Sequence, residues 1–581
     1  MIRLYKKMGW FFKQEAKVYL FMLLLLIFLA FFTMVPATVL GKAIDIVSTG
    51  SLTKPILLGL FLLLLAIPVL RYLFDYLYHY TINKEGQKLS YQLRKKYLDH
   101  LFEMDSMLFE EFTKGDLISR VTADLEAITL SMTSLLQEVV YQSGLLIFAL
   151  SAMAFTISWE LTLISATILP IGLVILNKIR IKKRGYYETH KKIYSKMTEK
   201  VLETVEGVKV IRAYVAEEQD LKVVNETIKA DIDSWKKISM FEMWFGPLFD
   251  LVYSISYFLA FLFGTLFVIN NKITPGQLVT FVMYIGMLSG PIITLSTVLN
   301  TASTASVACD RYYEILNKKP NVSDNSDSKE IFTFNKIDFN NVTFKYPFDK
   351  NPVIKNITFS IKKGETIGIV GPTGAGKSTL IRQLLREFNV TDGSVLLDDD
   401  EISNYKIEDV RNLVGYVPQS HILFKKSVDE NILVGKPEAV ATELQQAIKI
   451  ADFSKDINFL HEGLNTIVGE QGATLSGGQK QRLSIARALV KNPDILILDD
   501  SLSAVDAKTE ETIINHLKEY RQNKTNIIVA HRFSAILSAD KIIVLEDGKI
   551  SQLGNHRELL SQDGWYKRQF IIQSPDTEVV K

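Results

Sequence analysis

Cysteine is almost absent from this chain, and neither sign of charge predominates. The 581 residues include one cysteine, Cys309, which excludes an internal disulfide and is typical of a reducing compartment or a membrane protein. The formal net charge is +2, from 66 basic and 64 acidic side chains, so a general nucleic-acid-binding surface is not expected. The length exceeds that of one hydrophobic core, which predicts two or more domains.

Charge is also missing from long stretches of the first half of the chain. A bilayer core of ~30 Å requires about 20 apolar residues per helix. Six runs meet or approach this requirement and predict six transmembrane helices, at about residues 18–41, 55–80, 137–159, 161–180, 249–271 and 276–300. Buried helices of a large soluble protein would not account for so many uncharged runs. Residues 1–316 are therefore predicted to form a helical bundle in a lipid bilayer.

Basic residues mark the cytoplasmic side of this bundle. Lysine and arginine are dense before the first run and in the long segments 82–138 and 178–249, whereas the other connections are short. The positive-inside rule places the N-terminus, both long segments and everything after the sixth helix, including the C-terminus, in the cytoplasm. The first run is too long for a cleaved signal peptide and lacks a small-residue cleavage site. A multi-pass protein of the cell membrane is predicted.

The composition changes after Cys309. Residues 317–330, NKKPNVSDNSDSKE, are polar and predict a linker. Residues 331–572 alternate short β-branched runs, such as ETIGIV, with helical patterns such as QKQRLSIARALV. This alternation is typical of an α/β domain with a parallel sheet and helices on its faces.

The stretch GPTGAGKST is the clearest mark of chemistry in this second domain. It follows the strand-like TIGIV and precedes the helix-like LIRQLL, which is the context that a phosphate-binding loop requires. In such a loop the glycines let backbone N–H groups crowd round the phosphates, the lysine reaches the β and γ oxygens, and the serine hydroxyl ligates Mg²⁺. A tight glycine turn without a ligand is the alternative. The nucleotide-binding candidates are Gly371, Pro372, Thr373, Gly374, Ala375, Gly376, Lys377, Ser378 and Thr379, with Ser378 also a metal ligand.

A second apolar run, ILIL, ends at two adjacent carboxylates, Asp499 and Asp500. At the end of a strand beside the phosphate loop, Asp499 is placed to hold the Mg²⁺ shell. A helix cap or a solvated turn is the alternative interpretation of an acid in this position. Together with the phosphate loop, the metal-binding interpretation is favoured.

Four further stretches give the domain a family resemblance. LSGGQ at Leu475 to Gln479, VPQS with Gln419, SAVD ending at Asp506 and VAHR with His531 resemble, in order and spacing, the ATP-binding cassette of ABC transporters. With six predicted helices ahead of one cassette, the whole chain resembles a half-transporter of the exporter type. The resemblance implies a type IV (type-1) exporter membrane domain fused to a P-loop cassette, with ATP and Mg²⁺ as cofactors.

The resemblance also implies a role for each motif. Tyr346, in FKYP, resembles the aromatic residue that stacks on adenine, although a surface tyrosine is the alternative. Gln419 resembles the glutamine that senses Mg²⁺ and the membrane domain, and His531 resembles the histidine that contacts the γ-phosphate. With Asp500, these two are the catalytic candidates, and Gln419 is also a candidate metal ligand.

The signature LSGGQ opens a predicted helix, so its bare amides and hydroxyl at a positive helix end form an anion site. In the family this site engages the γ-phosphate bound to the opposite cassette, so a chain with one cassette must dimerise. The candidates that the resemblance assigns to nucleotide binding are Ser476, Gly477, Gly478, Gln479 and Asp506.

Two cytoplasmic segments, 109–128 and 203–219, resemble the loops through which exporters of this type touch their cassettes. Glu470, in VGEQG, resembles a residue on the cassette side of that contact. Solvated amphipathic helix is the alternative interpretation of both loops.

Asp500 departs from the family pattern. Exporters of this family place a glutamate after the strand-end aspartate, and this glutamate polarises the attacking water. Aspartate reaches about 1.5 Å less far, and a misplacement of ~1 Å costs on the order of 10²-fold in rate. The departure resembles the weak subunit of heterodimeric bacterial multidrug exporters. It predicts a weak ATP site in this chain and a second half-transporter as partner.

Other functions remain open. A homodimeric exporter of lipid or peptide and an ATP-binding sensor or regulatory membrane subunit are the alternatives. Importers are disfavoured because their membrane and cassette parts are usually separate chains, and soluble DNA-repair cassettes are excluded by the six helices.

The substrate is the least determined property. Aromatic residues of the fifth helix predict a cavity for a hydrophobic compound, with lipid contact as the alternative: Phe258, Phe261, Phe263 and Phe267. Arg71 and Asp75, one turn apart in the second helix, could form a substrate site but are most simply expected to pair with each other. Asp250 lacks an obvious local partner and is a candidate for attracting cationic compounds.

Overall fold

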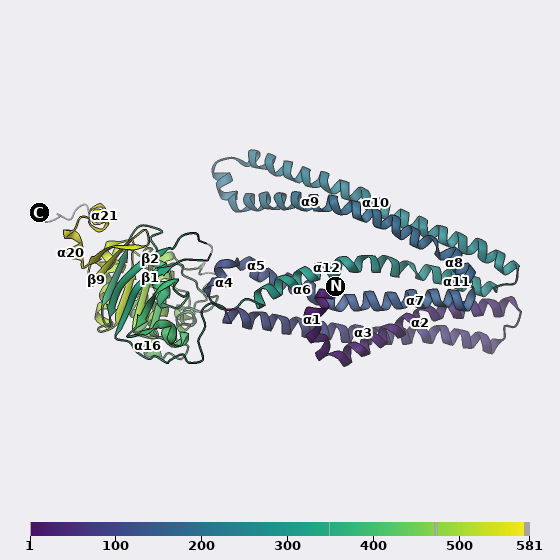
Figure 1. Cartoon of the computed structure of the whole chain (residues 1–581), viewed down its shortest axis with the longest axis horizontal. Helices are drawn as coiled ribbons and strands as arrows, with labels where there is room; N and C mark the ends of the chain where they lie inside the picture. The colour runs from purple at the N-terminus through teal and green to yellow at the C-terminus, as the bar shows by residue number, and fades with distance from the viewer. Residues whose placement is uncertain (1, 348, 470–471, 473, 574–581) are drawn as a thin grey trace. The chain divides into compact units, whose positions relative to one another are not determined.

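A computed structural model describes residues 2–347, 349–469, 472 and 474–573 of the chain (Figure 1). The chain divides into two compact units. The first comprises Met1–His100 and Gly115–Asn317, and the second comprises Leu101–Lys114 and Lys318–Lys581. The helical segment 101–114 therefore packs with the C-terminal domain, although it lies in the N-terminal half of the sequence.

The first unit is helical throughout its described part. Its helices are α1 (Ile2–Gln14), α2 (Ala16–Ser48), α3 (Lys54–Glu103), α5 (Lys114–Ser119), α6 (Leu125–Leu136), α7 (Gln142–Ala152), α8 (Trp159–Ala166), α9 (Ile168–Ala213), α10 (Glu217–Ile269), α11 (Pro275–Met287) and α12 (Ser289–Leu316). Three π-helical turns, Arg120–Asp124, Gln137–Tyr141 and Met153–Ile157, alternate with α5, α6 and α7 in one helical stretch that ends at Ile157, and the extended residue Ser158 separates this stretch from α8.

Five of these helical stretches are long and apolar enough to cross a membrane, counted over the described residues. They are Ala16–Ser48, Lys54–Glu103, Lys114–Ile157, Glu217–Ile269 and Pro275–Thr294. A shorter apolar stretch, Trp159–Gly172, lies where the fourth transmembrane helix is predicted. Within lipid a helix satisfies its own backbone polar groups, which is why these apolar sequences adopt helical structure.

Hydroxyl groups tie these apolar helices together. The Thr38 hydroxyl of α2 lies 2.6 Å from the Tyr284 hydroxyl of α11, and the Ser256 hydroxyl of α10 donates to the Ser165 carbonyl at 2.7 Å. In a bilayer there is little hydrophobic drive between helices, so close packing and such hydrogen bonds hold the bundle.

The pairing predicted between Arg71 and Asp75 is wrong. The Asp75 carboxylate lies 3.7 Å from the Nε2 atom of His79, one turn further along α3. Asp75 has a basic side chain one turn away in each direction, and the structure pairs it with the one toward the C-terminus. Spacing alone did not distinguish the two.

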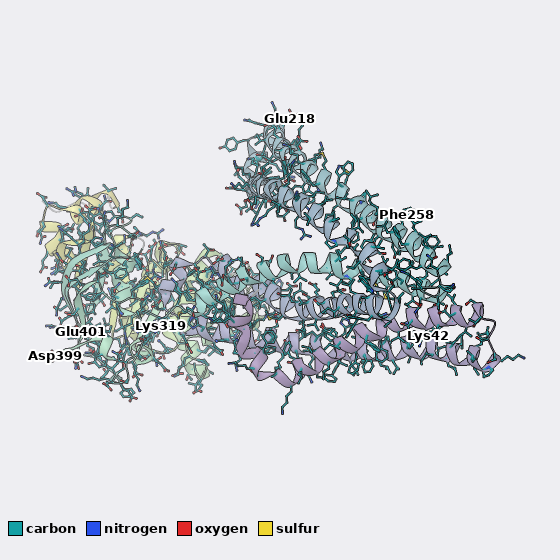
Figure 2. All side chains as sticks on the ribbon, turned by 45° about the vertical axis from the view of Figure 1, so that its right-hand side comes forward. Lys42, Glu218, Phe258, Lys319, Asp399 and Glu401 are labelled. Atoms are coloured by element: carbon teal, nitrogen blue, oxygen red, sulfur yellow. The ribbon has the colours of Figure 1, made fainter. Side chains whose placement is uncertain are left out.

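Helices α9 and α10 form a long antiparallel pair (Figure 1). Their polar halves are joined by side chains from both helices: Lys200 pairs with Asp220 at 3.0 Å, and the His190 Nδ1 atom lies 2.8 Å from the Ser234 hydroxyl. Figure 2 shows Glu218 beside the turn between the two helices, and Phe258 much further along α10. The segment 203–219 thus comprises the end of α9, this turn and the start of α10.

The second unit contains two sheets. A six-stranded sheet has the order β10-β9-β3-β8-β7-β6, built from β3 (Thr366–Val370), β6 (Val414–Val417), β7 (Ile495–Asp499), β8 (Thr525–Val529), β9 (Lys541–Glu546) and β10 (Lys549–Gly554). All its pairings are parallel except that of β10 with β9. Every residue of β7 and β8 is buried, as expected for parallel strands covered on both faces.

The second sheet is antiparallel, in the order β2-β1-β4-β5, from β1 (Lys336–Phe344), β2 (Ile354–Lys362), β4 (Asp392–Leu397) and β5 (Asp400–Glu401). The helices of this unit are α4 (Ser106–Glu111), α13 (Lys377–Leu384), α14 (Ile407–Leu413), α15 (Val428–Leu433), α16 (Ala441–Ile450), α17 (Ser454–Ile457), α18 (Gly477–Leu489), α19 (Ala507–Tyr520), α20 (His556–Ser561) and α21 (Trp565–Gln573). The parallel strands β3, β7 and β8 all end at one edge of their sheet, where the predicted site residues follow them.

Candidate functional site: a phosphate loop at the strand ends

The loop between β3 and α13 has the backbone of a phosphate-binding loop. Gly371, Gly374 and Gly376 have φ angles of +149°, +84° and +93°, in the region that favours glycine. A Cβ atom on Gly371 would lie 2.0 Å from the Leu545 carbonyl oxygen of β9. The glycine is therefore required for the loop to pass the neighbouring strand.

Lys377 opens α13 and turns back over the loop. Its Nζ atom donates to the carbonyls of Gly371 at 2.8 Å and Pro372 at 2.9 Å, and the side chain is buried. Burial lowers the pKa of the Lys377 ammonium below its usual value, while Asp500 and Asp499 act in the opposite direction. A buried cation is thus held within the glycine-rich loop by two backbone carbonyls, an arrangement suited to a polyanion.

Asp499 ends β7 and lies next to Ser378 of α13. The Ser378 hydroxyl donates to Oδ1 of Asp499 at 3.0 Å, and the Tyr416 hydroxyl donates to Oδ2 at 3.3 Å. Burial raises the pKa of Asp499, and these two hydrogen bonds oppose that effect because they stabilise the ionised form. A hydroxyl and a carboxylate in contact supply two oxygen ligands of the kind that Mg²⁺ prefers.

Asp500 adopts a left-handed backbone conformation with φ of +49°, and its amide donates to the Val529 carbonyl at 3.0 Å. Its Oδ2 atom lies 3.5 Å from the Gln419 Nε2 atom, which follows β6. Asp500 and His531 line one small pocket at the ends of β7 and β8. The structure therefore brings Gln419, Asp499, Asp500 and His531 to the edge that carries the phosphate loop.

Tyr346 lies beside the phosphate-loop helix. Its hydroxyl is 3.2 Å from the Thr379 hydroxyl, and its ring packs edge-on against Phe388 with centroids 5.4 Å apart. The tyrosine is half-buried, so part of its surface is accessible. Its place next to α13 is compatible with an aromatic platform at the nucleotide site.

The signature residues are held by a different set of contacts. Ser476 caps α18: its hydroxyl accepts from the Gln479 amide at 3.3 Å, and the Gln479 side chain accepts from the Ser476 amide at 2.9 Å. An added Cβ on Gly478 would lie 3.3 Å from the Ala504 carbonyl oxygen. The Gln481 side chain of α18 accepts from the Ala504 amide at 3.0 Å, which fixes this helix end to the SAVD stretch.

Asp506 acts as a helix cap in this structure. It accepts from the Thr509 amide at 2.9 Å and from the Thr509 hydroxyl at 2.8 Å, at the start of α19. These hydrogen bonds lower the pKa of the Asp506 carboxyl. Glu470 lies outside the described residues.

Sequence reasoning missed two members of this site. Tyr416 was not singled out, although it lies on β6 three residues before Gln419 and its hydroxyl donates to Asp499 directly. Arg382 of α13 was also missed; its guanidinium contacts Glu387 at 2.6 Å and lies over the Phe388 ring. The helical spacing of Arg382 from Ser378 was the available signal, since residues four apart share one face.

These features define a P-loop nucleotide-binding cassette joined to a helical membrane domain. The chain matches the family model described as ABC transporter transmembrane region over residues 19–292 and the model described as ABC transporter over residues 354–503. It belongs to the ABC transporter family.

Similar proteins extend over the whole chain. It is 38% identical over 99% of its length to a Bacillus subtilis protein described as a probable multidrug resistance ABC transporter ATP-binding/permease protein, YheI, of which it covers 98%. It is 36% identical over its full length to the full length of MdlA, a multidrug resistance-like ATP-binding protein of Buchnera aphidicola subsp. Schizaphis graminum. A solved structure of a bacterial Atm1-family ABC exporter with ATP bound has a TM-score of 0.81 and 24% identity, with 97% of this chain and 99% of that chain covered.

The predicted fold class, an exporter-type helical membrane domain fused to a P-loop cassette, is confirmed. The chain is a multi-pass membrane protein of a family that couples ATP hydrolysis to transport.

Proposed function

We propose that this chain is one half of a multidrug-type exporter, with a hydrolytically weak ATP site of its own and an intact signature motif that completes the site of a second half-transporter. Asp500, directly after the buried Asp499, is the observation that carries this proposal. The multidrug descriptions of the similar proteins support the class of substrate.

The residues present fit ATP and Mg²⁺. The loop glycines leave room for phosphate against backbone amides, and Lys377 supplies a cation within the loop. Ser378 and Asp499 would hold Mg²⁺, which neutralises charge on the phosphate oxygens when it is bound. Tyr346 would support the base.

The Asp500 side chain is shorter than the glutamate side chain that orients the attacking water in this family. Glutamate would extend about 1.5 Å further, and a catalytic group misplaced by ~1 Å loses on the order of 10²-fold in rate. In addition, Asp500 already lies 3.5 Å from the Gln419 amide, which directs one carboxylate oxygen toward that side chain. We therefore expect this site to bind ATP and to hydrolyse it slowly.

The signature motif would bind a phosphate that is held by another chain. The Ser476–Gln479 capping box satisfies two groups at the start of α18, and the helix still presents N–H groups and a positive dipole end at Gly477 and Gly478. A γ-phosphate bound to a second cassette would meet these amides, as would the hydroxyl of Ser476.

Steady-state ATPase of the co-expressed pair in lipid tests the proposal. Asp500→Asn is expected to change turnover little, because productive cleavage occurs at the partner's site. Gly478→Asp places a negative charge where the partner's γ-phosphate binds, and loss of such stabilisation costs about 10²–10³-fold. Gly478→Ala, which adds only the Cβ that would meet Ala504, is the steric control. If Asp500→Asn silences the pair as fully as Gly478→Asp does, Asp500 is a working base and the asymmetric dimer is wrong.

The alternatives differ in what the chain does alone. A homodimeric exporter of lipid or peptide would show full ATPase activity without a second gene product. A sensor or regulatory subunit would bind ATP without substrate-stimulated turnover in any pairing. Asp500→Glu, which should only partly activate the weak site, adds a third measurement to the same assay.

The substrate is proposed to be a hydrophobic or cationic compound. The four phenylalanines of α10 divide in the structure: Phe258 and Phe261 are exposed, whereas Phe263 and Phe267 pack against the core of the helical unit. Asp250 is also exposed in this apolar segment, where an unpaired carboxylate is costly unless it faces water or a cation.

Transport of tetraphenylphosphonium, a lipophilic cation, tests the role of Asp250. Asp250→Asn is expected to raise the half-saturating concentration of this cation, with Asp233→Asn on the polar part of α10 as the matched control. Equal transport by all three proteins would remove Asp250 from the substrate site.

We place both termini and the cassette in the cytoplasm, in accordance with the basic segments flanking the membrane runs.

A further inference from the structure

Arg382 lies at the meeting point of α4 and the nucleotide site. Its Nη1 atom is 3.6 Å from the Glu110 carboxylate of α4, and its Nε atom donates to Glu387 at 2.6 Å. The guanidinium also lies over the ring of Phe388, 5.1 Å from the centroid. Phe388 in turn packs edge-on against Tyr346. One side chain therefore contacts α4 and the aromatic pair beside the phosphate-loop helix.

Helix α4 is a defined element within the second unit. Asp105 caps it by accepting from the Met107 amide at 3.1 Å, and the same carboxylate accepts from the Val322 amide at 3.0 Å. Glu111 pairs with Lys318 at 2.6 Å. Because these contacts lie at the two ends of the segment, α4 is attached to the chain near residue 320 independently of Arg382.

The contact between Glu110 and Arg382 is weaker than the contact between Arg382 and Glu387. At 3.6 Å it is longer than the 2.6 Å contact to Glu387, and Glu110 is about half exposed, with a relative side-chain exposure of 48%. Such pairs contribute little to stability on their own. A small displacement of the guanidinium is thus sufficient to make or break the link to α4 while the link to Glu387 persists.

We propose that Arg382 is a positioning residue through which ATP occupancy of this chain's own site is transmitted to α4. The inference rests on the proposed function in one respect, the placement of the base at Tyr346. A base stacked on Tyr346 constrains the tyrosine ring, Phe388 packs on that ring, and Arg382 packs on Phe388, so its guanidinium moves relative to Glu110. A site that hydrolyses slowly would in this way still report that ATP is bound.

The test measures the environment of α4 and ATP binding separately. A maleimide fluorophore is attached to the thiol of Phe109→Cys, a half-exposed position of α4, in the full-length chain in lipid nanodiscs. The native Cys309 is buried, and burial raises the pKa of its thiol to about 11, so it reacts poorly at neutral pH. ATP binding is followed in parallel by labelling with a photoreactive ATP analogue.

In the parent, ATP is expected to change the emission of the fluorophore with the same half-saturation as photolabelling. Glu110→Gln should reduce this emission change by about fivefold or more, a typical scale for coupling between sites, while photolabelling persists. Arg382→Gln should reduce the emission change to the same extent. The emission change of the double variant should be reduced no further than that of either single variant, because both substitutions remove the same contact between Glu110 and Arg382. Glu111→Gln, on the same helix but paired with Lys318, is the matched control and should retain the signal.

The outcomes separate the two claims. If ATP fails to label the chain, or labels Tyr346→Ala as tightly as the parent, the assignment of the base, and with it the basis of the relay, is wrong. If labelling is normal and the emission change persists in Glu110→Gln and Arg382→Gln, the relay is overturned and the nucleotide site stands. An equal loss of the emission change in Glu111→Gln would also overturn the relay through Arg382, because the fluorophore on α4 would then respond to the loss of any contact that holds this helix.

Discussion

Lys377→Ala should weaken ATP binding to this chain by about 10- to 150-fold. The lysine is 7% exposed, and its hydrogen bonds to the Gly371 and Pro372 carbonyls hold the ammonium within the loop. A hydrogen bond to a charged group contributes about 1.5–3 kcal/mol, and every 1.4 kcal/mol changes a dissociation constant tenfold. Removing the ammonium therefore accounts for the expected range without any change of fold.

Photolabelling of the co-expressed pair over a range of ATP-analogue concentrations measures this effect on each chain separately. The half-saturating concentration should rise for this chain and stay constant for the partner. Lys362→Ala, an exposed lysine of the same domain, is the control. Because burial lowers the pKa of Lys377, labelling of the parent should decline as the pH rises through a range below that of ordinary lysines. Equal half-saturation of Lys377→Ala and parent would refute the assignment of the loop.

Two further predictions concern the same edge of the sheet. Gly371→Ala should abolish labelling and lower the unfolding temperature, because the added Cβ would lie 2.0 Å from the Leu545 carbonyl oxygen. Gly374→Ala has open space around the added Cβ, so it should lower the free energy of unfolding only by the strain of φ +84°, about 1–2 kcal/mol. Tyr416→Phe removes a donor that lowers the pKa of Asp499, so the Mg²⁺-dependent rise of labelling should shift to higher pH. An unchanged pH profile would show that this hydrogen bond does not hold the carboxylate ionised.

The phosphate loop was predictable because its residues are contiguous. A strand, a glycine-rich turn and a helix start lie within one short stretch, so the local sequence determines both the backbone and the placement of Lys377 and Ser378. The contact between Ser378 and Asp499 was also within reach, because parallel strands end at one edge of a sheet. Local sequence patterns are sufficient to predict a contact when a general rule, here that parallel strands end at one edge of the sheet, determines which residues are neighbours.

Tyr416 could not be found in this way. It contacts Asp499 because β6 lies next to β7, and the strand order β3-β8-β7-β6 is not stated by any local pattern. The same limitation explains Asp75, whose basic neighbours on either side were equivalent by spacing. The contact between Glu110 and Arg382 spans 272 positions, and it depends on α4 packing with a domain that follows it much later in the chain.

Asp506 shows how a resemblance and a structure contribute different information. The motif SAVD resembles a stretch at the nucleotide interface of the family, yet here the Asp506 side chain accepts from Thr509 as a helix cap. The neighbouring Ala504 is fixed to α18 through Gln481, so the SAVD stretch and the signature helix form one connected surface. A displacement of either part is therefore expected to shift the other. This connection links the start of α18, which carries the signature residues, to the short segment between β7 and α19 that contains Asp500.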